Sequence, residues 1–169
     1  MTETLSLTPD RERGGYLLHA ECVLPCPLDE VFPFFADARN LQQLTPAWVN
    51  FEILTSGEIA MHAGALIDYR LRIRGVPLRW RTKITAWEPQ RRFVDEMLRG
   101  PYRWWRHEHA FEECPGGTRV VDRVHYGVPG GALVNWLVVS RDVRAIFAYR
   151  QQVLGELFTR REQRVAVAS

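Results

Sequence analysis

The chain has 169 residues, of which 46% are hydrophobic and 25% are charged, as is typical of a globular protein with one core. The formal net charge is only +2, from 22 Lys and Arg against 20 Asp and Glu, so no nucleic-acid partner is expected. The three cysteines lack the paired spacing of a disulfide framework or a cysteine-based zinc site. We therefore expect a folded cytoplasmic protein.

Neither a signal peptide nor a membrane span is expected from the sequence. The N-terminal stretch MTETLSLTPDRERGG contains acidic residues and no apolar core of signal-peptide length. No run of residues approaches the roughly 18 apolar residues of a membrane span, so no stable membrane insertion is expected. We expect a flexible N-terminal tail over residues 1–14, a single domain over 15–163 and a flexible C-terminal tail over 164–169.

The first elements are a strand and a helical segment. The stretch YLLHAECVL, residues 16–24, is rich in strand formers and stops at PCP, because proline removes a donor from the strand ladder. The following PLDEVFPFFADARNLQQL has apolar residues three and four apart and acidic residues in its first turn, which predicts helix. Pro33 and the break at Asn40 indicate two short helices.

Six further strands are expected over residues 49–56, 65–74, 78–87, 92–98, 103–113 and 118–128. The later breaks are short and contain Gly or Pro, which predicts antiparallel hairpins. The spacing then becomes helical and predicts one long closing helix. Its first part, GALVNWLVV, is apolar on nearly all sides, which fits a cavity lid or portal, a homodimer contact, or a buried helix start.

Tight hairpins predict one continuous inward face, because directly opposed residues share a face of the sheet. This face is mostly apolar or aromatic, but it also carries Asp95 opposite His107 and Asp122 opposite His109. Buried carboxylates and imidazoles are costly unless they are paired or hydrated. We therefore expect these four side chains to pair across the strands.

The other face of the sheet is rich in arginine. The hairpin that places Ile73 opposite Leu78 also places Arg72 opposite Arg79, and Arg70 opposite Arg81 follows in the same register. Like charges directly opposed are locally unfavourable. A solvated face is the simpler interpretation, and a protein-interaction surface is the alternative.

The order of the elements resembles the helix-grip fold of the START-like or SRPBCC superfamily over roughly residues 16–158. PLDEVFPFFADARNLQQLTPAW is similar to the family segment P-x-x-x-V-F-x-F-F-x-D followed by N-L-x-x-x-T-P. GPYRWWRHEHAFEECPGGTRVVDRVHYGVPGG is similar to G-P-F, W-x-H-x-H-x-F, G-T and D-x-V-x-Y in a subgroup of that superfamily, which includes the polyketide cyclase/dehydrase group. The resemblance implies an α+β fold with a seven-stranded curved antiparallel sheet wrapped around a long C-terminal helix.

The resemblance also implies a START-like ligand-binding domain over residues 15–163. Its cavity, between sheet and helix, would hold a hydrophobic small molecule such as a lipid, an isoprenoid, a polyketide-like compound or an aromatic compound. The expected ligand-binding residues all lie on the inward face: Tyr69, Leu71, Trp80, Thr82, Phe93, Asp95, Met97, Trp105, His107, His109, Asp122, Val124 and Tyr126.

The candidate catalytic residues are His107, His109, Asp95 and Asp122. They could orient a ligand, fix the strand register, or transfer protons on a bound carbonyl compound as in a cyclase/dehydrase-type enzyme. A carboxylate raises the pKa of a neighbouring imidazole, which would place a base near neutral pH. Zinc and iron sites use the same ligand types, but the superfamily does not generally need metal, so no metal and no other cofactor is expected.

Overall fold

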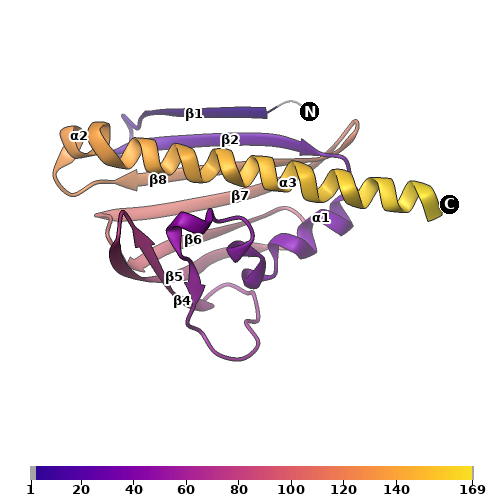
Figure 1. Cartoon of the computed structure of the whole chain (residues 1–169), viewed down its shortest axis with the longest axis horizontal. Coiled ribbons are helices and arrows are strands. Elements are labelled where there is room, and N and C mark those ends of the chain that lie inside the picture. The colour runs from indigo at the N-terminus through magenta and orange to yellow at the C-terminus, as the bar shows by residue number, and fades with distance from the viewer. Residues whose placement is uncertain (1–2, 169) are drawn as a thin grey trace.

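Eight antiparallel strands form one sheet in the order β1-β2-β8-β7-β6-β5-β4-β3. The computed structural model describes residues 3–168 and confirms the helix-grip fold, with one strand more than the seven expected (Figure 1). The strands are β1 (Glu3–Pro9), β2 (Tyr16–Leu24), β3 (Glu52–Ile53), β4 (Leu66–Ile73), β5 (Val76–Glu88), β6 (Arg92–Arg99), β7 (Trp104–Cys114) and β8 (Gly117–Gly127).

The additional strand is β1, within residues 1–14 that were expected to form a flexible tail; residues 1–2 lie outside the described part of the chain. It pairs antiparallel with β2 along its whole length. Leu5 and Leu7 pack against an apolar cluster of the core, and their alternation with Ser and Thr is the period of a half-buried strand. The Gln151 amide of the C-terminal helix donates to the Thr4 and Glu21 carbonyls at 3.0 and 2.9 Å.

The helical segment after β2 consists of α1 (Leu28–Phe35) and two 3₁₀ turns (Ala38–Gln42 and Ala47–Val49), where two short helices were expected. α1 buries Phe32, Phe34 and Phe35 against the core. Phe34 meets Phe158 edge to face, with ring centroids 5.4 Å apart. This contact fixes α1 beneath the C-terminal half of the long helix (Figure 1).

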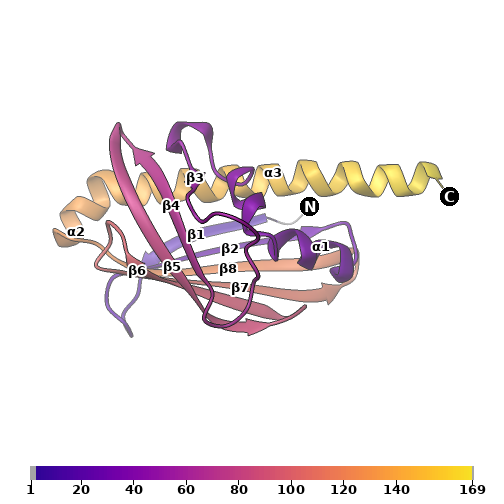
Figure 2. The same cartoon turned by 90° about the horizontal axis from the view of Figure 1, so that it is seen from below.

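The closing helix is present and has a wider turn near its start. α2 (Gly131–Val134) leads through a π-helical turn (Asn135–Val139) into α3 (Ser140–Ala168). α3 continues through residues 164–168, which were expected to belong to a tail; residue 169 lies outside the described chain. The curved sheet wraps one side of α3 (Figure 2). No helix among residues 3–168 is long and apolar enough to cross a membrane.

The hairpin between β4 and β5 differs from the expected register by two residues. Ile73 lies opposite Val76 rather than Leu78. Arg74 and Gly75 form a two-residue turn with φ values of 50° and 83°, as in the tight turns that suit the twist of paired strands. Because the shift is even, every inward side chain stays inward.

The same shift changes the arginine-rich face. Arg81 lies opposite Asp68 rather than Arg70, and its Nε and Nη2 atoms donate to the two carboxylate oxygens of Asp68 at 2.8 Å each. Arg70 lies opposite Arg79 and forms an ion pair with Glu52. Acidic partners therefore offset part of the positive charge on this face.

The other hairpins have the expected register around the four polar side chains. Ile84 lies opposite Asp95, Asp95 opposite His107, and His109 opposite Asp122. The interior position of this polar group on the sheet is therefore confirmed.

Candidate functional site

A cavity of about 190 Å³ lies between the concave face of the sheet and α3. Strands β4 to β7 form one wall, while α1, the two 3₁₀ turns and the first half of α3 form the other. Apolar and aromatic side chains make up most of the lining, as in typical small-molecule sites.

Nine of the expected ligand-binding residues line this cavity: Tyr69, Leu71, Trp80, Thr82, Phe93, Asp95, Trp105, His107 and His109. Four do not, although alternation along the strands placed them on the same face. Val124 and Tyr126 are fully buried in a cluster that β2 and α3 cover. Asp122 lies behind the two imidazoles, and Met97 lines a separate depression beside Trp104.

The helix supplies cavity residues that were missing from the expected set. Val143, Ile146, Phe147 and Arg150 line the cavity from α3, three and four residues apart, which is one stripe of a helix. Arg150 is only 4% exposed. An arginine within an apolar stripe is the sequence signal that could have identified it.

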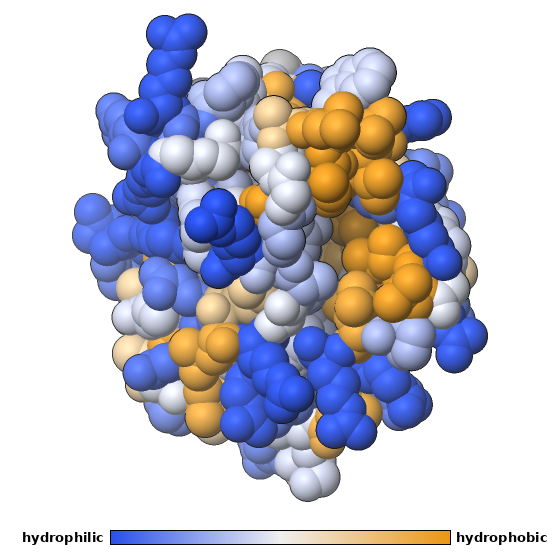
Figure 3. Space-filling view, turned by 90° about the vertical axis from the view of Figure 1, so that its left-hand side faces the viewer, coloured by the Kyte–Doolittle hydropathy of each residue, from blue (hydrophilic) through white to orange (hydrophobic). Residues whose placement is uncertain are grey.

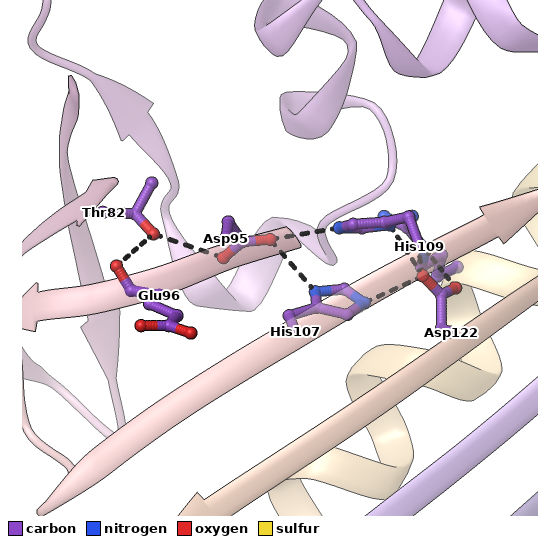
Figure 4. Close-up of polar contacts among 7 residues, drawn as sticks. Thr82, Asp95, Glu96, His107, His109 and Asp122 are labelled. Carbon is purple, nitrogen blue, oxygen red and sulfur yellow. Dashed lines mark hydrogen bonds and ion pairs between the residues drawn. The ribbon is translucent and has the colours of Figure 1, made fainter. Parts of the chain in front are cut away.

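The polar cluster consists of Asp95, His107, His109, Asp122 and Arg150, with both imidazoles between the two carboxylates (Figure 4). Asp122 Oδ1 lies 2.8 Å from His107 Nε2 and 2.9 Å from His109 Nδ1. Asp95 Oδ2 lies 3.1 Å from His109 Nε2 and 3.7 Å from His107 Nδ1. Asp122 therefore contacts both rings within hydrogen-bond distance.

The observed pairing differs in part from the expected one. Asp122 does contact His109, but the 3.7 Å between Asp95 and His107 is too long for a hydrogen bond. The shortest contacts of Asp95 and of His107 run diagonally, to His109 and Asp122. Thr82 adds a bond that the pairing argument did not contain, because its hydroxyl donates to Asp95 Oδ1 at 3.2 Å.

Arg150 connects this cluster to α3. Its Nε donates to Asp122 Oδ2 at 2.9 Å and its Nη2 to Asp122 Oδ1 at 3.3 Å. The guanidinium also lies over the ring of Phe35, 5.3 Å from its centroid. Planar, two-point contact to a carboxylate is the geometry that arginine favours, so the helix and the sheet are joined by a buried ion pair.

The environment fixes the charges of the carboxylates. Burial alone would raise the pKa of Asp122, but Arg150 and the hydrogen bonds from both imidazoles hold that pKa well below its usual range. Burial likewise opposes ionisation of Asp95, but His109 and the charge of His107 lower the pKa of Asp95. Both carboxylates are therefore ionised at neutral pH.

The two imidazoles differ from each other, although their ring centroids are only 3.7 Å apart. Burial and the neighbouring His109 lower the pKa of His107. Burial also disfavours the charged form of His109, but its hydrogen bonds to Asp122 and Asp95 outweigh that effect and raise the pKa of His109. The first proton that the two imidazoles take up is therefore on His109.

The indole N–H of Trp80, a residue that lines the cavity, has no hydrogen-bond partner. Trp80 is 6% exposed and stacks on Tyr69 at a centroid distance of 5.7 Å. Among the described residues, none accepts a hydrogen bond from its buried Nε1. A buried donor without an acceptor is costly, so an oxygen atom that reached this N–H would be stabilising.

The apolar segment before α3, residues 131–139, is mostly exposed. Of its three interpretations, a buried helix start is therefore excluded, and a cavity lid or portal and a dimer contact are left. Leu133, Trp136 and Leu137 are 65%, 69% and 50% exposed. Seen from this end of the molecule, apolar atoms gather on both sides of a hollow (Figure 3). Arg74, in the nearby β4–β5 turn, forms an ion pair with Asp142 of α3. Its Nη2 and Nε atoms donate to the two carboxylate oxygens at 2.9 and 3.0 Å.

Comparison with known proteins agrees with this architecture. The family model described as "Polyketide cyclase / dehydrase and lipid transport" matches residues 24–148. A comparison with curated protein sequences finds no significant match.

Solved structures share the fold at low sequence identity. Protein Ms6760 from Mycobacterium smegmatis is 17% identical, with 94% of this chain and 98% of that chain covered and a TM-score of 0.67. Protein CV1439 from Chromobacterium violaceum is 14% identical, with 84% and 96% covered and a TM-score of 0.67. Ara h 8.0201 is 14% identical, with 91% and 99% covered and a TM-score of 0.60.

Proposed function

Because the chain belongs to the polyketide cyclase/dehydrase and lipid-transport family, we propose that it binds a hydrophobic small molecule in the cavity between the sheet and α3. The observation that carries the proposal is the cavity itself, about 190 Å³ in volume with an aromatic and aliphatic lining. Removing apolar surface from water contributes about 25 cal/mol per Å². Apolar burial would therefore supply most of the affinity.

The cavity volume favours a small ligand. An engineered apolar cavity of about 150 Å³ holds benzene, and the cavity of this chain, at about 190 Å³, is somewhat larger. A compound with one or two rings, or a short isoprenoid, would fit with small adjustments of the side chains. Longer lipids and extended polyketides would require the helix and sheet to separate further.

The polar groups of the lining indicate what the ligand carries. The unpartnered indole N–H of Trp80 supports a ligand with a carbonyl or hydroxyl oxygen. The carboxylate of Asp95, at the same cavity, would accept a hydrogen bond from a ligand hydroxyl. An oxygenated aromatic or isoprenoid compound therefore fits the lining better than a pure hydrocarbon.

Proton transfer on a bound carbonyl compound is the second candidate function. The observation that favours it is that His107 and His109 both line the cavity beside Asp95. A base within reach of a bound substrate is the first requirement of such chemistry. Replacing both histidines with glutamine would abolish turnover and only weaken ligand retention if this reaction occurs.

Native mass spectrometry of the purified chain, followed by solvent extraction, tests the binding proposal. We expect one apolar molecule per chain. Leu71→Trp fills the cavity from its lining and should abolish retention. Val76→Trp, in the same hairpin but 57% exposed, is the matched control and should retain the ligand. Equal retention by both folded variants would contradict binding in this cavity.

A further inference from the structure

The polar cluster holds two carboxylates and one guanidinium. Arg150 is the only arginine or lysine among the described residues that contacts either carboxylate, and it contacts Asp122. Asp95 is held only by the Thr82 hydroxyl and the His109 ring, beside a mostly apolar cavity. A largely buried carboxylate in such surroundings favours a nearby positive charge.

The contacts of the cluster show which ring nitrogens face Asp95. His107 Nε2 lies 2.8 Å from Asp122 Oδ1, and His109 Nδ1 lies 2.9 Å from that oxygen and 3.2 Å from Nη2 of Arg150. The other ring nitrogens, His107 Nδ1 and His109 Nε2, face Asp95 Oδ2, at 3.7 and 3.1 Å. One carboxylate oxygen and two ring nitrogens therefore face one another beside the cavity.

Without a metal ion, Arg150 donates to His109 Nδ1, so the hydrogen of that ring is on Nε2 and bonds to Asp95 Oδ2 at 3.1 Å. His107 Nδ1 stays 3.7 Å from that oxygen, beyond hydrogen-bond distance. A metal ion that replaces the hydrogen on His109 Nε2 could accept electron pairs from all three atoms at once.

The spacing of the three atoms fits such an ion. Asp95, His107 and His109 each offer one ligand atom, and these atoms lie within 4.8 Å of one another. Donors bound to one tetrahedral ion at about 2.1 Å lie about 3 to 3.5 Å apart, close to the two measured separations. We propose that Asp95, His107 and His109 bind one divalent transition-metal ion of the zinc or ferrous type.

The surroundings support metal binding in two ways. Asp122 contacts the outer nitrogen of each histidine, which is how protein carboxylates orient and strengthen imidazole ligands. Arg150 forms an ion pair with Asp122, and its Nη2 also lies 3.2 Å from Nδ1 of His109, the ring nitrogen that faces away from Asp95. All three ligand residues line the cavity, so the remaining coordination positions face a bound molecule, as in two-histidine, one-carboxylate sites.

The test uses the full-length chain without an affinity tag, after dialysis against a chelator. Zn²⁺ titrated by calorimetry should bind with a stoichiometry of one, and Co²⁺ should give the visible absorption of a nitrogen- and oxygen-ligated ion. Absence of stoichiometric binding by both ions in the unmodified chain would overturn the proposal without recourse to any variant.

Variants then locate the site. His107→Gln and His109→Gln should each weaken Zn²⁺ binding by at least about 100-fold, and Asp122→Asn, which acts through the histidines, by about 10- to 100-fold. The control is His62→Gln, because His62 is exposed and contacts only a backbone carbonyl in its own loop. Unchanged affinity in the folded His107 and His109 variants would also overturn the proposal.

The metal proposal does not depend on the proposed function. If the chain binds an apolar molecule equally well with and without chelator but takes up no metal, the cavity proposal stands and the metal site does not. Nitrogen-15 NMR that finds both ring nitrogens of His109 protonated in the presence of Zn²⁺ would show that Nε2 carries a hydrogen and not a metal ion, and would contradict metal binding.

Discussion

The side chain of Arg150 joins α3 to the sheet through Asp122, and both partners are about 5% exposed. Removing one member of a buried pair leaves the other charge without compensation, at a cost of about 3 to 5 kcal/mol. We expect Arg150→Met to lower the free energy of unfolding in urea by this amount.

Arg74→Met provides the control for this prediction. Arg74 also contacts an aspartate of α3, but its side chain is 55% exposed. Exposed ion pairs contribute about 0 to 1 kcal/mol, so the control should lose little stability. Equal losses in the free energy of unfolding would show that the buried Arg150–Asp122 pair stabilises the fold no more than the exposed Arg74–Asp142 pair does.

The indole N–H of Trp80 allows a second prediction at the scale of one residue. Trp80→Phe keeps an aromatic ring in the cavity wall and removes the donor. One hydrogen bond contributes about 0.5 to 1.5 kcal/mol, so the affinity for an oxygenated ligand should fall about 2- to 12-fold. Calorimetric titration measures this change, and Trp48→Phe, at a residue that is 45% exposed and does not line the cavity, should leave the affinity unchanged. A rise in affinity for Trp80→Phe would exclude the indole as a ligand donor.

For single residues, the sequence predicts which side of the sheet a side chain faces better than it predicts which other side chains it contacts. Alternation along β6, β7 and β8 correctly predicts that Asp95, His107, His109 and Asp122 point inward. It cannot predict the diagonal contacts, because these depend on side-chain rotamers. Nor can it predict Arg150, which comes from another element and reaches the cluster only after α3 has packed on the sheet.

Among the elements, β1 is followed by a turn that a side-chain hydrogen bond joins to β8. Asp10 Oδ2 lies 2.7 Å from His125 Nδ1 of β8, and the Asp10 Oδ1 atom accepts hydrogen bonds from the amides of Glu12 and Arg13 at 3.1 Å. The bond to His125, followed by the backbone bond to Arg13, lowers the pKa of Asp10 below its ordinary value of 3.8. The charged form of Asp10 is therefore the form that the folded chain favours.

This shift predicts an acid-dependent loss of stability. A carboxylate with a lowered pKa in the folded state stabilises the fold above its ordinary pKa, and that contribution is lost as the pH falls through the lowered value. Asp10→Asn should therefore reduce stability near pH 6 and have a smaller effect near pH 2, as measured by urea unfolding at both pH values. Glu113→Gln, at an exposed side chain, is the control. If the stability difference between Asp10→Asn and the unmodified chain grew as the pH fell, it would contradict a lowered pKa for Asp10 in the folded chain.

The two expectations about elements that failed have physical reasons. β1 was predicted as a tail because the N-terminal stretch contains acidic residues and no long apolar run, but its alternating leucines bury one side against the core. The β4–β5 register was predicted two residues too wide because Pro77 was taken as part of the turn. Pro77 instead lies at the second position of β5, opposite Arg72, near the strand start where proline is tolerated.

At the scale of the whole molecule, the order of the elements was enough to predict the helix-grip fold. The size of the cavity could not be predicted, because it depends on the distance at which α3 packs over the sheet. Large side chains contribute to that distance: Phe147 and Phe158 of α3 are almost completely buried and pack in two different clusters of the core.

The central claim, that an apolar ligand binds between the sheet and α3, is tested most directly by methyl NMR with 1-naphthol as the probe. We predict shift changes at the methyl groups of Ile67, Leu71 and Ile146, which line the cavity. The methyl groups of the exposed Leu133 and Leu137 should change little. Shifts confined to Leu133 and Leu137, with the cavity methyl groups unaffected, would contradict the account.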